Sequence, residues 1–332
     1  RSNYSKRILL IIPVIIVNPK LNLTKDPIAK LIKKIAIPAS VGTFFQTMFN
    51  VVDTFFAGKI SPEALSALAK SFPIYFIIIA ACVGVTVGGT SLIANSIGEN
   101  NKEKILGYFS QTIIFGFLVS ILITIIGFVF SPVLFSLISS DEQFVLLGLK
   151  YTNVIFAGSI IFITVVALNS LLHADGDTKT YRNVLIVSFL LNIILNPLFI
   201  FGYGFVPPMG IAGIGFATIV AQFIGLLIIF NKIIKSSRIK NIQIINFYPK
   251  IYLLKNLFNQ SAPISATLLL ISVGNFVVLA YISVFGEHAI AGYGAAARFE
   301  QILLLPVLGL NTAIISIISQ NFGAKNYLRV KE

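Results

Sequence analysis

Four oxygen-bearing side chains could together hold a small cation or a proton. They are Asp53, Asn192, Asn196 and Thr218. A carboxylate, two amide carbonyls and a hydroxyl are hard oxygen ligands that suit a monovalent cation, and a carboxylate inside a membrane can also relay a proton. Ordinary hydrogen bonding between helices is the structural alternative for the asparagines and the threonine. The presence of Asp53 favours the ion-binding interpretation.

Asp53 lies near the end of an apolar stretch that runs from about Ile35 to Phe56. A helix of this length crosses a bilayer core, which requires about 20 apolar residues. An aspartate at mid-membrane costs about 2.5–3.5 kcal/mol to insert, so a group that is kept there usually has a function. The alternative is an aspartate close enough to the outer end to reach water. Asn50, three residues earlier on the predicted helix, is a possible supporting residue.

The other three side chains are predicted at a similar depth. Asn192 and Asn196 are four residues apart, so a helix presents both amides on one side, and Pro197 frees a backbone carbonyl near them. Thr218 lies on the next apolar segment. Asp53, Asn196 and Thr218 each fall roughly 5–8 residues, or ~8–12 Å, from the outer boundary of their helices. We therefore expect them to meet.

The composition predicts that these segments are membrane helices. The 332 residues are 56% hydrophobic and only 11% charged, against about 25% charged in soluble domains. Apolar runs separated by short polar loops indicate an all-α polytopic membrane protein with about eight spans. The expected spans are 33–58, 70–97, 106–130, 144–172, 181–204, 210–233, 259–285 and 289–319. The net charge of +13 does not indicate nucleic acid, because the basic residues are dispersed among helix ends. The single cysteine, Cys82, excludes a disulfide framework.

The basic residues also predict orientation. Most of the 25 Lys and Arg residues fall on one side if the N-terminus is cytoplasmic, as the positive-inside rule requires. Asp53, Arg298 and Glu300 are then the charges placed inside spans, all in the outer half of the membrane. Arg298 and Glu300 are possible supporting residues, and a purely structural bridging role is an equal alternative for both.

The second half of the sequence repeats the first with a shift of 225 residues. The shift pairs Pro38 with Pro263. It also pairs identical residues that constrain the backbone or have polar side chains. These further pairs are Ser40/Ser265, Asn50/Asn275, Gly84/Gly309, Ser91/Ser316, Gly98/Gly323 and Asn101/Asn326. Because the shift spans an even number of helices, the copies have the same orientation, a plan that secondary transporters use. The second repeat is expected to be incomplete here, and Asp53 pairs with Val278, so ion coupling is expected in the first repeat.

The repeat suggests a division into four parts. Residues 1–22 have no assigned role, and 23–233 form a first lobe of six helices. Residues 234–258 form a basic cytoplasmic linker expected to lie against anionic headgroups. Residues 259–332 begin the second lobe.

A metal-bound pyrophosphate site at Asp175 and Asp177 is a weaker hypothesis. The segment HADGDTKT contains one D-x-D pair, but Gly176 with nearby Lys179 and Arg182 is typical of a cytoplasmic turn. No second histidine lies near His173. We therefore expect no metal site beyond a possible Na⁺ at Asp53.

Several segments, in order along the chain, resemble the MATE (multidrug and toxic compound extrusion) transporters. They are Pro38…Asn50-Val-Val-Asp53-Thr-Phe-Phe-Ala-Gly58 with Pro62-Glu63-Ala64-Leu65, then Gly176-Asp177-Thr178-Lys179, Asn192…Asn196-Pro197, and Ala297-Arg298-Phe-Glu300 with Gln320-Asn-Phe-Gly323. The segments that begin at Ala297 and Gln320 resemble in particular the DinF-like members of the bacterial and archaeal branches. The resemblance covers about Leu23 to the end of the sequence.

The resemblance implies two six-helix lobes around a central cavity, in a monomer of the inner (plasma) membrane. It implies export of amphipathic, often cationic drugs in exchange for Na⁺ or H⁺, with no enzymatic activity and no cofactor other than the coupling ion. The family's cation site would fall on Asp53, Asn192, Asn196 and Thr218. The acid that some members carry at the position of Asn196 is absent, as is the helix-seven acid of others. A lipid-linked oligosaccharide flippase and a membrane-embedded transferase are the alternatives.

Overall fold

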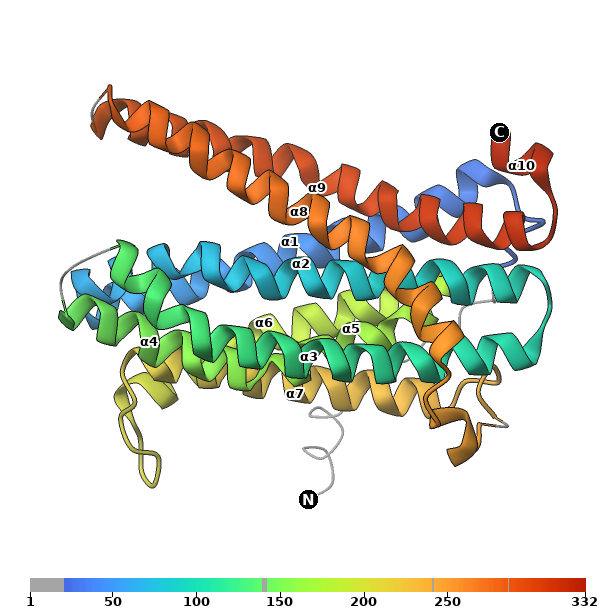
Figure 1. Ribbon diagram of the computed structural model, residues 1–332, viewed down its shortest axis with the longest axis horizontal. Helices are drawn as coiled ribbons and strands as arrows, with labels where there is room; N and C mark the ends of the chain where they lie inside the picture. Colours follow the sequence, from blue (N-terminus) through green and yellow to red (C-terminus); the bar gives the residue numbers. More distant parts are fainter. Residues whose placement is uncertain (1–20, 139–141, 241, 286) are drawn as a thin grey trace, which may run out of the picture.

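A computed structural model describes residues 21–138, 142–240, 242–285 and 287–332 (Figure 1). The structure therefore does not describe residues 1–20, which include nearly all of the unassigned segment 1–22. The described helices are α1 (Ile28–Ile60), α2 (Pro62–Gly98), α3 (Lys102–Ile138), α4 (Glu142–Ala157), α5 (Ser159–Ala174), α6 (Thr178–Phe201), α7 (Ile211–Ile234), η2 (Ile244–Phe247), α8 (Ile251–Ser283), α9 (Glu287–Gly323) and α10 (Tyr327–Lys331). Among these residues there are no strands beyond one isolated bridge between Tyr203 and Val206.

Seven of the described helices are long and apolar enough to cross a membrane, and an eighth span results if α4 and α5 are counted together. This agrees with the eight predicted spans. Each predicted range lies largely within one helix or, for 144–172, within the α4–α5 pair. The all-α, polytopic fold is confirmed.

The span predicted at 144–172 is present but broken into α4 and α5. The helix bends by 41° at Gly158, between α4 and α5. A Cβ atom on Gly158 would lie 2.4 Å from Cδ1 of the Ile219 side chain of α7, so a larger residue here would require that side chain to move. The Thr124 hydroxyl of α3 donates to the Phe156 carbonyl at 2.9 Å and lies 2.8 Å from the Ser159 hydroxyl. These bonds supply partners beside the break, as a bend at membrane depth requires.

The helices form a seven-helix bundle, α1–α7, with a hairpin of α8 and α9 lying across it (Figure 1). In the bundle, α6 packs against α1 and α7, while α2 packs against α3, α4 and α5. The hairpin rests on the bundle where α8 meets α2 and where α9 meets α1 and α2. We call these parts the bundle and the hairpin.

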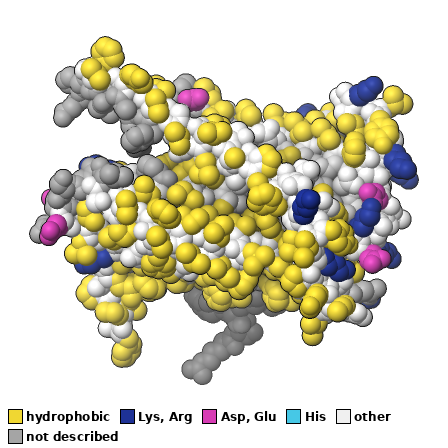
Figure 2. All heavy atoms as spheres, in the orientation of Figure 1, with side chains coloured by type: hydrophobic (Ala, Val, Ile, Leu, Met, Phe, Trp, Pro, Cys, Tyr) yellow, Lys and Arg dark blue, Asp and Glu magenta, His cyan; other side chains and the backbone are white. Residues whose placement is uncertain are grey.

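The two ends of the molecule differ in charge. At one end lie residues 99–101, 175–177, 235–250 and 324–332, and Lys and Arg side chains gather mainly there (Figures 1 and 2). We call this the basic end. At the opposite end the ribbons of α8 and α9 stand away from the bundle (Figure 1). The hairpin and the bundle therefore meet at the basic end and diverge toward the other.

The structure confirms the internal repeat. The bounds of α9 follow those of α2 by the same shift of 225 residues, and α10 begins where α3 would begin after that shift. The turns that follow α2 and α9 also share their backbone geometry. Asn100 and Lys325, which the shift pairs, have φ of 55° and 57°, values that non-glycine residues seldom adopt. The two repeats thus agree in conformation as well as in sequence.

The repeats also contact each other symmetrically. A Cβ atom on Gly84 in α2 would lie 2.1 Å from the Ser265 hydroxyl of α8. A Cβ atom on Gly309 in α9 would likewise lie 2.1 Å from the Ser40 hydroxyl of α1. The shift of 225 relates both glycines and both serines. The hairpin is therefore related to α1 and α2 by a pseudo-two-fold axis, with small residues allowing each close crossing.

The linker predicted at 234–258 is partly helical and partly bound to the bundle. Its last third belongs to α8, which begins at Ile251, and its middle is bound to the bundle. The buried Gln111 side chain of α3 donates to the carbonyls of Asn246 and Tyr248 at 3.1 and 2.9 Å, and accepts from the Lys250 N–H at 3.0 Å. These bonds attach the linker to α3 directly.

Candidate cation or proton site

The site begins with the buried face of α1. Phe49, Asp53 and Ala57 are buried and spaced four residues apart, so they form one narrow stripe along the helix. Asp53 is only 6% exposed. Helix α1 can lie close to α6 because a Cβ atom on Gly42 would already contact α6, 3.1 Å from Leu185 Cδ1 and 3.3 Å from Arg182 Cα. The stripe thus places a carboxylate in the α1–α6 contact.

Helix α6 supplies the two amides. Ser188, Asn192 and Asn196 recur every four residues and are fully buried, which makes a polar stripe on an otherwise apolar helix. Both asparagines donate from Nδ2 to Asp53 Oδ1, each at 2.9 Å. Ser188 donates to the Ala221 carbonyl of α7 at 3.2 Å, which joins the stripe to the next helix.

Helix α7 supplies the hydroxyl. Thr218 is buried and donates from Oγ1 to Asp53 Oδ2 at 3.1 Å. The approach of α7 to α6 depends on small residues, since a Cβ atom on Gly213 would lie 2.6 Å from the Phe199 carbonyl. Three helices thus meet at one carboxylate, and the residues predicted to share its depth do so.

The Asp53 carboxylate accepts three hydrogen bonds, whereas the two amide oxygens beside it accept none in the described structure. Oδ1 of Asn192 and Oδ1 of Asn196 are buried and have no hydrogen-bond partner in the structure. A buried acceptor left unpaired costs about 1–3 kcal/mol. Each amide therefore offers its nitrogen to Asp53 and keeps a free oxygen, which is a ligand that a cation or an acidic proton could use.

Two of the three possible supporting residues, Asn50 and Glu300, do not join the site. Asn50 is exposed, because the buried stripe of α1 runs through the fourth neighbours of Asp53 and not the third. Glu300 is exposed on α9. The side chain of Arg298 lies outside the described residues.

The D-x-D pair serves the turn that the sequence predicts. Asp175 Oδ1 accepts from Arg238 Nε at 2.9 Å. Asp177 caps α6 by accepting from the N–H and the hydroxyl of Thr180 at 3.1 and 2.6 Å. Within the described residues no cluster of three or more His, Cys, Asp or Glu side chains is arranged to hold a metal.

Sequence analysis missed the polar contacts between α9 and the bundle. Ser316 and Gln320 donate to backbone carbonyls at the end of α5. Ser316 and Gln320 are spaced four residues apart on an apolar helix, and this spacing could have predicted their contacts, as it did for Asn192 and Asn196.

Replacing Thr218 with valine should lower the free energy of unfolding by about 1–3 kcal/mol, because Asp53 Oδ2 loses a buried donor while the shape is kept. Thermal or denaturant unfolding of the solubilised protein measures the change. Thr267→Val is the control, since that hydroxyl bonds only within its own helix, to the Pro263 carbonyl. Equal effects of the two substitutions would show that the Thr218–Asp53 bond contributes nothing.

Comparison with known proteins places this geometry in a family. The MatE family model matches residues 38–198 and 263–332, more than half of the chain. A FAD transporter of Shewanella oneidensis is 26% identical over 93% of this chain and 69% of its own length. A probable multidrug resistance protein, NorM, of Thermotoga maritima is 27% identical over 90% of this chain and 64% of its own length. The chain thus spans about two thirds of the length of the curated relatives it matches.

Solved structures agree. A MOP superfamily transporter from Pyrococcus furiosus is 27% identical, with a TM-score of 0.85 over 93% of this chain and 68% of that one. An outward-facing multidrug resistance MATE family transporter is 26% identical, with a TM-score of 0.83 over the same shares. The matched segments contain Asp53, Asn192 and Asn196 in the first repeat and the whole of α9 in the second. The chain belongs to the MatE family of membrane transporters.

Proposed function

We propose that the whole protein is a secondary active antiporter that exports amphipathic organic cations in exchange for Na⁺ or H⁺. The observation that carries the proposal is a buried carboxylate inside a spanning helix, Asp53, which accepts hydrogen bonds from three uncharged side chains. Among the described residues no Lys or Arg side chain bonds to this carboxylate, so it is available to a mobile cation. The names of relatives such as multidrug export protein MepA of Staphylococcus aureus support the class of substrate.

The orientation follows from charge. We place the basic end in the cytoplasm, since Lys and Arg residues are retained on that side, and with it the N-terminus. The protein would then lie in the plasma membrane, and the end at which α8 and α9 diverge from the bundle would face outward (Figure 1). The likeness to a transporter solved in an outward-facing conformation supports this assignment.

Coupling would work through the two free amide oxygens. In the present arrangement Asn192 and Asn196 turn their nitrogens toward an ionised Asp53. A bound Na⁺, or a proton on Asp53, needs an acceptor in place of a donor, and each amide supplies one by rotating through half a turn. Because both amides lie on α6 and the carboxylate on α1, binding or release of the ion would change the contact between those helices. The lobes would then rock between outward- and inward-open states.

The substrate has a second candidate. The FAD transporter of Shewanella oneidensis is among the relatives, so export of a flavin nucleotide is a specific alternative to export of organic cations. The two classes differ in charge. A transport assay that offers both a cationic dye and FAD therefore separates them.

Export by the full-length protein in inverted membrane vesicles tests the function. Gradients of Na⁺ and of H⁺ are imposed separately, and uptake of a cationic dye and of FAD is followed. We expect one gradient to drive uptake of one of these substrates, and that gradient identifies the coupling ion. Uptake that ignores both gradients would overturn the antiport proposal.

A further inference from the structure

We propose that Ser316 and Gln320 of α9 form a latch that keeps the hairpin and the bundle closed against each other at the basic end. The proposal rests on the proposed function in one respect, because a latch has to release only if the two parts rock. Its contacts lie far along α9 from the α8–α9 tip, at the end where the hairpin meets the bundle (Figure 1).

The geometry of the latch is a pair of bonds from side chains to backbone. The Ser316 hydroxyl donates to the His173 carbonyl at 2.7 Å, and Gln320 Nε2 donates to the Ala174 carbonyl at 2.6 Å. Both side chains are buried. The acceptors belong to the last turn of α5, where carbonyls carry partial negative charge, and the His173 carbonyl also accepts from the Gly176 N–H at 2.8 Å. Buried donors from α9 therefore close the end of a bundle helix.

A second set of donors binds the segment that precedes α1. The buried Asn321 donates from Nδ2 to the Leu23 carbonyl at 3.0 Å, and Arg329 of α10 donates to the carbonyls of Leu23 and Asp26. In both sets the donors belong to the second repeat and the acceptors are backbone groups of the first. On the bundle side, the contact therefore depends on the positions of backbone carbonyls. The strength of the contact depends on the side chains that α9 and α10 contribute.

The backbones themselves touch at this level. A Cβ atom on Gly98, the last residue of α2, would lie 1.9 Å from the Gln320 carbonyl. A Cβ atom on Gly323, its repeat partner at the end of α9, would lie 2.0 Å from the Asn95 carbonyl. The donors of the latch thus flank a contact in which α2 and α9 leave no room for side chains.

The two latch residues differ in what they lose on release. Ser316 also bonds to the Thr312 carbonyl of its own helix at 3.0 Å, so its hydroxyl keeps a partner when the parts separate. The Gln320 amide makes no such bond within its own helix in the described structure, so on release it must exchange the Ala174 carbonyl for water. We therefore expect Gln320 to contribute more to closure than Ser316.

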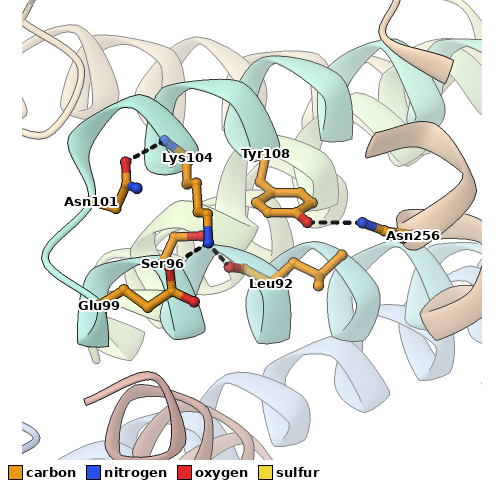
Figure 3. A network of polar contacts seen from close by, with 7 residues as sticks. All are labelled: Leu92, Ser96, Glu99, Asn101, Lys104, Tyr108 and Asn256. Atoms are coloured by element: carbon orange, nitrogen blue, oxygen red, sulfur yellow. Dashed lines mark hydrogen bonds and ion pairs between the residues drawn. The ribbon is translucent and has the colours of Figure 1, made fainter. Parts of the chain in front are cut away.

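Figure 3 shows another link between the hairpin and the bundle. Asn256 of α8 donates to the Tyr108 hydroxyl of α3 at 3.0 Å, and this pair is exposed. Nearby, Lys104 of α3 forms an ion pair with Glu99 at 2.7 Å, a contact within the bundle alone. The buried bonds of α9 are therefore better placed than these to control closure.

The distance between two spin labels at the basic end tests the latch. In the full-length protein with Cys82 replaced by alanine, labels are attached to cysteines at Lys235 on the bundle and Leu328 on α10, both exposed. Pulsed electron paramagnetic resonance in lipid nanodiscs gives the distance distribution. We expect Gln320→Leu to raise the ratio of the long- to the short-distance population about fivefold to tenfold, the effect of losing one buried hydrogen bond. Ser316→Ala should raise it less.

Two further variants serve as controls for the distance measurement. Gln320→Glu keeps the size of the side chain but sets acceptors against the Ala174 carbonyl, so it should open the basic end further than Gln320→Leu. Ser319→Ala, on the same turn but with none of these bonds, should leave the distribution unchanged. A wild-type distribution in both Gln320 variants would overturn the latch.

The same measurement separates the latch from the proposed function. If the wild type gains the long distance when the coupling ion or a substrate is added and the Gln320 variants gain it without either, both proposals stand. If the variants open but the wild type never does, the latch stands and rocking transport fails. If the wild type opens and the variants behave like it, the latch alone fails.

Discussion

Asp53→Asn should abolish gradient-driven export. The substitution removes the only charge that the structure places among Asn192, Asn196 and Thr218. A charge-assisted contact in a buried site contributes about 1.5–3 kcal/mol, so affinity for the coupling ion should fall about tenfold to a hundredfold or more. Without a group that binds the ion in one state and releases it in the other, an imposed ion gradient cannot drive export.

The variant should nevertheless fold, so its loss of transport can be interpreted. An asparagine at position 53 keeps Oδ1 as the acceptor for the amides of Asn192 and Asn196, and its new N–H group can donate to the Thr218 hydroxyl. Glu103→Gln, which neutralises an exposed acid on α3, is the control for loss of one negative charge. Export by Asp53→Asn at the rate of the control would make Asp53 a structural residue.

Gly98→Ala should have the largest effect on the contact between the hairpin and the bundle. The new Cβ atom would lie 1.9 Å from the Gln320 carbonyl oxygen, a backbone atom that no side-chain rotation can move. Overpacking in a well-packed region costs about 1–3 kcal/mol even where side chains can yield. Here the helices must separate, so we expect a lower unfolding temperature together with an opened basic end.

Gly274→Ala is the matched control. This glycine lies in α8, and nothing lies within 4 Å of the Cβ atom it would gain. Since alanine is a better helix former by roughly 0.5–1 kcal/mol, this variant should be as stable as the wild type or slightly more so. If Gly98→Ala unfolded at the same temperature as Gly274→Ala, the close contact between α2 and α9 would be refuted.

The site was largely predictable because helical geometry fixes both direction and depth. Asn192 and Asn196 lie one turn apart and had to face the same way, and counting from helix ends put Asn196 and Thr218 level with Asp53. All three donate to its carboxylate. The repeat was predictable for a related reason, since its matched glycines and prolines carry backbone geometry.

What the sequence could not predict depends on which neighbour a helix meets. Asn50 is only three residues from Asp53, yet it is exposed because α1 buries a stripe narrower than half its surface. At the bend, Gly158 packs against Ile219 of α7, a contact between segments distant in sequence. The bonds of Ser316 and Gln320 to α5 have the same origin: their acceptors are carbonyls, which every residue possesses and no pattern singles out.

Direct measurement of ion binding to the purified protein tests the central claim, that Asp53 carries the coupling ion. Equilibrium binding of radioactive Na⁺ and uptake of protons after an acid step are measured on the wild type and on Asp53→Asn. We predict that the wild type binds one Na⁺ or takes up one additional proton, and that the variant loses this binding while its other titration is unchanged. Equal binding and equal proton uptake by the two proteins would contradict the assignment.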